Sequence, residues 1–147
     1  QHLADMGCEI EHGDQIILEA GGDALAPIDA DLSSAPDGAL ALAVACSFAS
    51  GPSRISGLHT LRHKESDRLE AMATELMRLG AVITIENDTL MITPRAMSAT
   101  VINPYGDHRV AMSLALVGLR IPGVVVDDSE VVNKTWPGFW EMLNSLE

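Results

Sequence analysis

The segment RHKESDR, at residues 62–68, combines side chains that can bind an anion with side chains that can move a proton. Its seven residues carry three cations, two carboxylates and a histidine. It follows an apolar, strand-like run at 55–61 and precedes apolar residues at 69, 72, 76 and 79, a spacing that indicates one face of a helix. A charge cluster at such a junction can meet a ligand with its side chains and with unpaired helix N–H groups. The plainer interpretation is a solvated turn in which Ser66 caps the helix.

Charged junctions of the same kind recur along the chain. They are APDG at 35–38, YGDHR at 105–109 and NKT at 133–135. Each predicted junction carries charge where a loop would need only turn-forming residues. This recurrence favours a shared binding site over four unrelated turns.

The charge balance indicates what kind of ligand such a site would take. The chain has nine Lys and Arg residues against 21 Asp and Glu, a formal net charge of −12. That charge disfavours a polyanionic partner such as nucleic acid. Several of the few cations nevertheless stand at predicted helix starts: Arg62, Lys64, Arg68, Arg109 and Lys134. We therefore expect local binding of a small anion.

Composition excludes several other classes of protein. The 147 residues suffice for one domain with a core, which must be aliphatic because 47% of residues are hydrophobic and only 3% aromatic. No apolar run approaches the roughly 18 residues of a membrane span, and no signal peptide opens the chain. No metal-ligand spacing is present. Cys8 and Cys46 lie in unrelated contexts, and Cys46 is expected to be a buried hydrophobe. A reducing, cytoplasmic setting is the expectation.

An internal repeat organises these junctions. MGCEI at 6–10 returns as LGAVI at 79–83, 73 positions later, and each is followed by a predicted hairpin with turns at Gly13-Asp14 and Asn87-Asp88. A strand at 27–32 and a helix at 37–49, stopped by Gly51, correspond to a strand at 100–103 and a helix at 107–119. Further elements are predicted as a strand at 54–58, a helix at 66–79, a strand at 124–127 and a closing helix at 135–146 with Pro137 in its first turn.

The repeating unit is therefore strand, helix, strand, helix, hairpin. It predicts an α/β fold with parallel strand pairs, in which ligands gather beyond the carboxyl ends of the strands. We interpret residues 1–147 as a single incomplete domain that holds the tail of one copy (1–22), a complete copy (27–94) and a last copy (99–147) without its hairpin. The chain is expected to be a piece of a larger protein.

The motifs PDGA, RHKESDR, GDHRVAMS and NKTWPGF, in this order, resemble the C-terminal part of the EPSP synthase (3-phosphoshikimate 1-carboxyvinyltransferase) family from about Ile28 to the end. RHKESDR and GDHR together are specific to that family. The resemblance implies an inside-out α/β barrel (α+β) of two domains, each built from three copies of the unit. It also implies that the extreme N-terminal segment returns to complete the C-terminal domain, and it implies no cofactor.

The resemblance further implies a reaction of the shikimate pathway, which leads to chorismate and the aromatic amino acids. An enolpyruvyl group passes from phosphoenolpyruvate to the 5-hydroxyl of shikimate 3-phosphate, and phosphate is released. Asp37 is implied to orient or deprotonate that hydroxyl, and Glu65 to handle protons at the methylene carbon. Asp37 is equally suited to cap a helix.

Further residues are implied to bind the substrates. Lys64 would contact the hydroxyl region and shikimate 3-phosphate, while Arg68 and Arg109 would hold phosphoenolpyruvate through their planar guanidinium groups. Lys134 would be a third cation on that ligand. Smaller roles fall to other members of the motifs: His108 next to the ligand, Asp107 shaping its loop, Ser66 and Thr135 as helix caps, and Thr60 where some relatives have an Asn that contacts the shikimate ring.

Several features depart from the family pattern. His63 stands where many relatives have an apolar residue, Gly38 stands where Ala is usual, and Thr60 puts the ring contact in doubt. The contacts of the other domain are missing, so the fragment is expected to be inactive alone. Its expected partners are the two substrates and the missing N-terminal part of the enzyme, with no nucleic acid and no membrane.

Two alternatives remain open. One is UDP-N-acetylglucosamine enolpyruvyl transferase, a sister family that lacks the Lys-Glu-x-Asp-Arg run. The other is a stand-alone anion-binding module derived from the enzyme. Asp37 and Glu65 argue against the module, because carboxylates beside the ligand do not help a pure anion binder.

Overall fold

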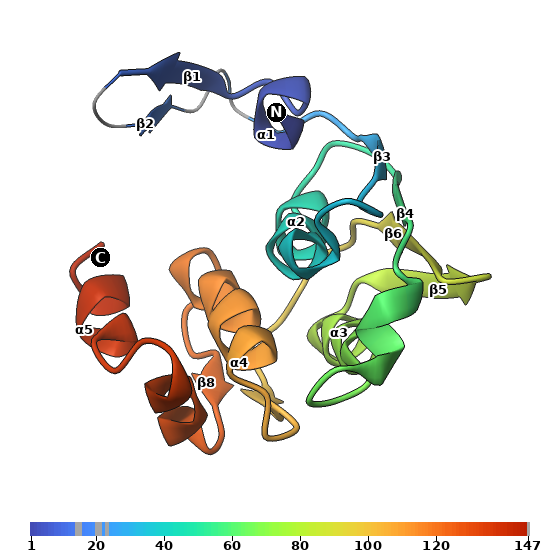
Figure 1. The fold of residues 1–147 in the computed structure, drawn as a ribbon. Helices are drawn as coiled ribbons and strands as arrows, with labels where there is room; N and C mark the ends of the chain where they lie inside the picture. Colours follow the sequence, from blue (N-terminus) through green and yellow to red (C-terminus); the bar gives the residue numbers. More distant parts are fainter. Residues whose placement is uncertain (14–15, 20–21, 23, 147) are drawn as a thin grey trace.

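The computed structural model describes residues 1–13, 16–19, 22 and 24–146. The described chain forms an arc with the β1–β2 hairpin and α1 at one end, α5 at the other, and the helices α2, α3 and α4 between them (Figure 1). In chain order the elements are α1 (His2–Asp5), β1 (Glu9–His12), β2 (Ile16–Glu19), β3 (Asp29–Asp31), η1 (Pro36–Gly38), α2 (Ala39–Cys46), β4 (Ser53–Ser56), η2 (His59–His63), α3 (Arg68–Leu79), β5 (Val82–Glu86), β6 (Thr89–Thr93), β7 (Val101–Ile102), α4 (His108–Ala115), η3 (Leu116–Leu119), β8 (Val125–Val126), η4 (Ser129–Lys134) and α5 (Phe139–Asn144), where η marks a 3-10 helix.

The strand pairing confirms the predicted α/β arrangement. β3 and β4 are parallel, as are β7 and β8, and each pair is joined through a helix. β6 lies antiparallel between β4 and β5, so the main sheet has the order β3-β4-β6-β5. The first parallel pair is followed by α3 and a hairpin, so the elements from β3 to β6 follow the order strand, helix, strand, helix, hairpin.

The β5–β6 hairpin forms where the alternating pattern predicts it. Ile83, Leu90 and Ile92 are buried on one face of the sheet. Asn87 and Asp88 make the turn with φ of 48° and 60°, a left-handed conformation that these two residue types adopt more readily than most. β1 and β2 pair antiparallel as the first hairpin, but the predicted turn at Gly13-Asp14 lies partly outside the described residues.

Helix α2 lies at the centre of the core. Its sequence, ALALAVAC, is apolar on every side, and six of its eight side chains are buried. α3 and α4 each present an apolar face, and both pack against α2. Leu76 and Leu79 of α3 are fully buried, and burial of a leucine contributes about 1.5–3 kcal/mol.

The starts of two helices differ from the prediction. Ser66 does not cap α3, because Asp67 accepts a hydrogen bond from the Glu70 N–H at 3.0 Å in that role. The closing helix begins at Phe139 and not at residue 135, since η4 occupies 129–134. Thr135 therefore ends η4 and caps no α-helix.

Several other bounds are shorter than predicted. The predicted helix 37–49 begins as the 3-10 turn η1 and ends at Cys46, well before Gly51. The strand-like run at 55–61 ends at Ser56, because Gly57 at φ +78° turns the chain out of the sheet and into η2. The helix expected at 107–119 is α at 108–115 and 3-10 beyond.

The two cysteines and the lengths of the helices can be compared with the sequence predictions. Cys8 and Cys46 are both free thiols, and burial raises the pKa of Cys46, as expected for a small buried hydrophobe. Among the described residues, no helix has the length and apolar character needed to cross a bilayer.

Candidate active site

Arg68, the first residue of α3, lies at the centre of the site. Its side chain is only 2% exposed, and its guanidinium donates to three carboxylates from three different segments. Nη1 donates to Asp37 at 2.8 Å, Nη2 to Glu65 at 2.8 Å, and Nε to Asp107 at 2.8 Å. Burial of a cation opposes its charge, but Asp107, Glu65 and Asp37 together hold the pKa of Arg68 above its ordinary value. A planar fork of donors suits this arrangement, which one ammonium group could not satisfy.

Asp107 is fully buried and joins α3 to α4. Its Oδ1 accepts the backbone N–H of Arg109 at 2.9 Å, which caps α4, while its Oδ2 accepts from Arg68 and from the Ser66 hydroxyl at 3.1 Å. Burial raises the pKa of Asp107, but hydrogen bonds from Arg68 and from the Arg109 backbone outweigh it and leave the pKa lowered. The predicted role of Asp107 in shaping its loop agrees with these contacts.

Glu65 sits between two cations. Lys134 Nζ donates to its Oε1 at 2.9 Å, and Arg68 donates to its Oε2. The hydrogen bond from Lys134, with a backbone hydrogen bond and the charge of Arg68, lowers the pKa of Glu65 to about 2. Glu65 is therefore a carboxylate at neutral pH.

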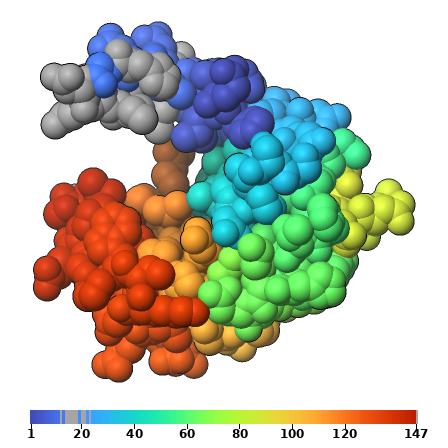
Figure 2. Space-filling view, in the orientation of Figure 1, coloured from blue at the N-terminus to red at the C-terminus, as the bar shows by residue number. Residues whose placement is uncertain are grey.

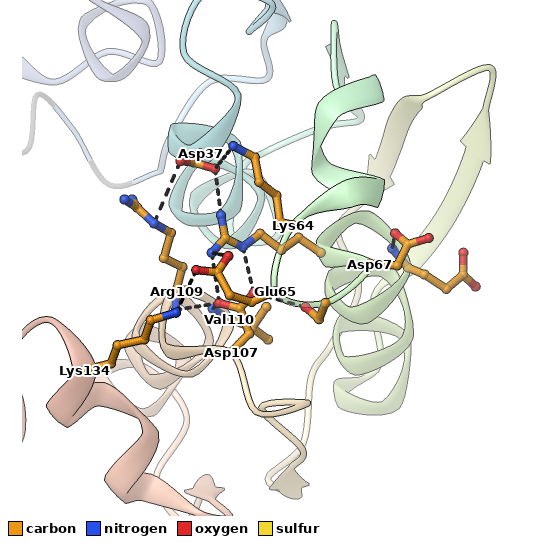
Figure 3. A network of polar contacts seen from close by, with 11 residues as sticks. Asp37, Lys64, Glu65, Asp67, Asp107, Arg109, Val110 and Lys134 are labelled. Carbon is orange, nitrogen blue, oxygen red and sulfur yellow. Dashed lines mark hydrogen bonds and ion pairs between the residues drawn. The ribbon is translucent and has the colours of Figure 1, made fainter.

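Asp37 is the focus of the remaining cations (Figure 3). Besides Arg68, it has Lys64 Nζ at 3.8 Å from Oδ1 and Arg109 Nε at 3.8 Å from Oδ2. Both distances are too long for hydrogen bonds. The side chains of Lys64 and Arg109 are about one third and one half exposed, so each can still donate to a ligand.

Backbone N–H groups at the starts of α3 and α4 already have hydrogen-bond partners. The N–H of Glu70 at the start of α3 is taken by Asp67, and the N–H groups of Arg109 and Val110 at the start of α4 are taken by Asp107. An anion in this site would therefore meet side chains of Lys64, Arg109 and Lys134 rather than these backbone groups.

Thr60 and His108 each bury a polar atom without a partner. Thr60 Oγ1 and His108 Nδ1 have no hydrogen-bond partner among the described residues. Burial lowers the pKa of His108, although the charge of Asp107 opposes the shift, so the imidazole is neutral at neutral pH. His108 and Arg109 also line a recess of about 280 Å³ between α4 and the segment after η4.

The structure brings most of the expected site residues together. Contacts of 3.8 Å or less connect a set that the sequence places up to 97 positions apart: Asp37, Lys64, Glu65, Arg68, Arg109 and Lys134. Thr60 and His108 belong to the same segments, but among the described residues the buried Thr60 Oγ1 and His108 Nδ1 make no hydrogen bond to this set. The number of cations exceeds that of carboxylates by one when Asp107 is included, within a chain of net charge −12.

The side-chain partners of Arg62 were not predicted from the sequence. Arg62 donates to Asp88 at 2.6 Å and to Asp67 at 3.1 Å. These bonds direct Arg62, the first residue of the RHKESDR segment, to the β5–β6 turn and to the cap of α3 instead of to the site. From the sequence, only a turn-forming role was predicted for Asp88. No short-range pattern connects it with Arg62, 26 positions away.

The fold is that of the enolpyruvyl transferases. The structure matches an EPSP synthase from Acinetobacter baumannii with a TM-score of 0.87 and 29% identity, over 97% of this chain and 37% of that one. It also matches the enolpyruvyl transferase NikO from Streptomyces tendae with a TM-score of 0.74, over 99% of this chain and 34% of that one; at 22% identity this likeness concerns the fold alone.

Sequence comparison specifies the family within that class. The profile of EPSP synthase (3-phosphoshikimate 1-carboxyvinyltransferase) matches residues 1–143, and the chain belongs to this family. Curated relatives named 3-phosphoshikimate 1-carboxyvinyltransferase include one from Methanoculleus marisnigri, 41% identical over 96% of this chain, and one from Shewanella baltica, 40% identical over 99%. The chain spans about a third of the length of these relatives, 33% and 34%.

Proposed function

We propose that this chain supplies one side of the active site of a 3-phosphoshikimate 1-carboxyvinyltransferase. The observation that carries the proposal is the Arg68 cluster, in which two partly exposed carboxylates, Asp37 and Glu65, stand beside cations with free donors. Cations alone would suit any small anion. Carboxylates in contact with them add groups that can accept protons during a transfer reaction.

The proposed reaction joins the 5-hydroxyl of shikimate 3-phosphate to phosphoenolpyruvate. The hydroxyl oxygen bonds to C2 of phosphoenolpyruvate while Asp37 takes the hydroxyl proton, and a proton adds to the methylene carbon to give a methyl group. The C2–O bond to phosphate then breaks, and loss of a methyl proton restores the double bond. The products are the enolpyruvyl ether and phosphate.

We propose that Glu65 exchanges the proton at the methylene carbon. With a pKa of about 2, it starts as a carboxylate and suits removal of the methyl proton. To donate a proton it must first lose part of its cationic surroundings. A phosphoenolpyruvate anion that draws Lys134 away from Glu65 would raise the pKa of Glu65 in that direction.

We assign substrate binding to the cations with donors to spare. Lys64 would contact shikimate 3-phosphate, and Arg109 and Lys134 the phosphoenolpyruvate anion. Arg68 already uses Nε, one N–H of Nη1 and both N–H groups of Nη2 on carboxylates, so a ligand contact would have to use the remaining N–H of Nη1. The orphaned Nδ1 of His108 and Oγ1 of Thr60 are the proposed sites of further hydrogen bonds to ligand.

The remaining part of the enzyme is the proposed partner of this chain. A groove of about 660 Å³ is lined mainly by apolar side chains of α1, α2 and η3, including Leu42 and Ala45, and by Phe48 just after α2. The space-filling view shows the surface hollowed between the N-terminal and C-terminal parts of the chain (Figure 2). α2 is apolar on all sides, yet Ala41 is exposed. A segment of the partner that covers the groove would bury this face of α2. The proposed cellular setting is the cytoplasm, where both cysteines stay reduced.

The experiment is phosphate release in a two-fragment mixture. The chain is mixed with the part of the Methanoculleus marisnigri relative that it does not match, and phosphoenolpyruvate and shikimate 3-phosphate are supplied. We expect activity in the mixture and none from either fragment alone. Binding of phosphoenolpyruvate without phosphate release, when association of the fragments is verified, would support the anion-binding module instead.

A further inference from the structure

Glu75, in the middle of α3, is a buried charge outside the site described above. It is 0% exposed, and a buried carboxylate is costly unless its oxygens are bonded. Oε1 accepts the Tyr105 hydroxyl at 2.9 Å, while Oε2 accepts the Asn103 backbone N–H at 3.2 Å and Arg78 Nη1 at 2.6 Å. Two of these three bonds lead into the loop that ends at Asp107.

That loop has a strained backbone. Tyr105 has a φ of +55° and Gly106 a φ of +66°, and the left-handed region is unfavourable for a bulky residue such as tyrosine. The Asn103 side chain accepts the Tyr105 N–H at 2.8 Å, and the Asp107 N–H donates to the Pro104 carbonyl at 2.9 Å. Burial raises the pKa of the Tyr105 hydroxyl and the Glu75 hydrogen bond raises it further, so Tyr105 stays a donor.

Arg68 and Glu75 are seven residues apart on α3, which places them on one face of the helix two turns apart. Arg68 binds Asp107 at the end of the loop, and Glu75 binds Asn103 and Tyr105 at its start. We propose that Glu75 is a positioning residue: through Tyr105 it fixes the loop so that Asp107 holds Arg68 and starts α4, which presents Arg109. We call the bonds from Glu75 to Asn103 and Tyr105 the Glu75 brace. Its effect on catalysis rests on the proposed function.

The repeat offers an internal comparison. Ala35 stands 70 positions before Tyr105, and Asp37 stands 70 positions before Asp107. Alanine has no hydroxyl to reach a partner, and Asp37 is 32% exposed whereas Asp107 is 0% exposed. The junction with the brace thus buries its aspartate as a structural anchor, and the junction without it leaves its aspartate open to a ligand.

The test is hydrogen exchange of single amides in the chain alone, followed by NMR. Tyr105→Phe deletes only the hydroxyl, Glu75→Leu removes both acceptor oxygens, and Glu75→Gln keeps one. We expect the amides of Arg109 and Val110 to exchange about tenfold faster in Tyr105→Phe and in Glu75→Leu, the size expected for loss of a bond to a charged group. Glu75→Gln should restore most of the protection.

Controls separate positioning from general stability. Arg78→Gln removes a partner of Glu75 on its exposed side and leaves both loop bonds, so the amides of Arg109 and Val110 should keep their protection. Amides in the middle of α3, such as that of Met72, should exchange at unchanged rates in Tyr105→Phe. Equal acceleration at Met72 and Val110, or no acceleration at Val110, would overturn the proposal.

A kinetic measurement tests whether the Glu75 brace affects substrate binding. In the two-fragment mixture, Tyr105→Phe should raise KM for phosphoenolpyruvate several-fold more than it lowers kcat, because a displaced Arg109 loses ligand contacts. If Tyr105→Phe has the same KM as the unaltered chain although its Val110 amide exchanges faster, the link between the loop and substrate binding is overturned. If the mixture that contains the unaltered chain shows no phosphate release although the fragments associate, the proposed function fails, while the exchange data still decide whether Glu75 positions the loop.

Discussion

Asp37 and Asp107 occupy the same position in two copies of the repeat, 70 residues apart, and one guanidinium holds both. Arg68 donates to Asp37 through Nη1 and to Asp107 through Nε, each at 2.8 Å. Lys64 and Lys134 are also 70 positions apart, and each approaches a carboxylate of the cluster. The site therefore lies where corresponding positions of the predicted repeat converge on the start of α3.

Replacement of Arg68 by lysine should destabilise the chain strongly. An ammonium has three N–H donors on one nitrogen and cannot make the four hydrogen bonds that the guanidinium makes to Asp37, Glu65 and Asp107. The fully buried Asp107 would therefore keep a nearby cation but lose hydrogen bonds from its main partner. We expect Arg68→Lys to lower the free energy of unfolding by about 3 kcal/mol or more. Urea denaturation would measure it.

The matched control is Arg54→Lys. Arg54 pairs with Asp29 at 3.0 Å, but both side chains are well exposed, and such surface pairs contribute less than about 1 kcal/mol. Similar losses for the two variants would contradict the structural role assigned to Arg68.

Most of the fold could be predicted because its signals are local. The alternation around Asn87-Asp88 predicted the β5–β6 hairpin, and the apolar spacing from Leu69 to Leu79 predicted α3. The bound at 135 was wrong because η4 runs to Lys134 and α5 begins only at Phe139. The bound at 66 was wrong for a tertiary reason. Ser66 donates to Asp107, 41 positions away, so Asp67 takes the cap.

The site was only partly within reach of the sequence. The motifs identified Asp37, Glu65 and their cations through the family resemblance, but nothing local indicates that Arg68 is buried beneath three carboxylates. Glu75 did leave a signal that was missed. It lies three residues after Met72, on the apolar face of α3, where a charge requires partners.

The pKa of Glu65 should depend on Lys134. An NMR titration of the Glu65 carboxyl should give a midpoint near 2 in the unaltered chain, and Lys134→Met should move it upward toward the ordinary 4.5. Lys64→Met, which removes a neighbour of Asp37 instead, should leave the midpoint near 2. An unchanged midpoint in Lys134→Met would contradict the ion pair.

The same shift predicts how stability changes with acid. Because the pKa of Glu65 is lower in the folded chain than its ordinary 4.5, the unfolded chain binds its proton first as pH falls. The stabilisation is therefore present above about pH 4.5 and is lost as pH falls toward 2. Glu65→Gln should differ from the unaltered chain in urea denaturation at pH 6, and the difference should shrink at pH 3. A difference that grows with acidity would reverse the sign and refute the assignment.

Asp37→Asn should separate ligand binding from chemistry. The amide keeps an oxygen that can accept from Arg68, but it is a very weak base. In the two-fragment mixture we expect phosphate release to slow by at least about 100-fold, the usual size of a general-base contribution. Phosphoenolpyruvate affinity, measured by calorimetry, should be equal or higher because a negative charge is gone. Asp29→Asn, which alters only a surface pair, should leave both quantities unchanged, and retention of full activity in Asp37→Asn would exclude Asp37 as the base.

Ala41→Glu tests whether the apolar groove is where the rest of the enzyme binds. Ala41 is exposed on α2 and lines the groove, so a glutamate there can stay in water while the chain is alone. When the partner fragment covers α2, the carboxylate would lose its hydration, which costs several kcal/mol. We expect the fragments to associate at least about 100-fold more weakly, measured by analytical ultracentrifugation, with an unchanged unfolding midpoint of the chain alone. Met77→Glu adds the same charge at an exposed position of α3 outside the groove lining and should leave association intact. Equal weakening by both variants would show that net charge, and not the groove, governs the contact.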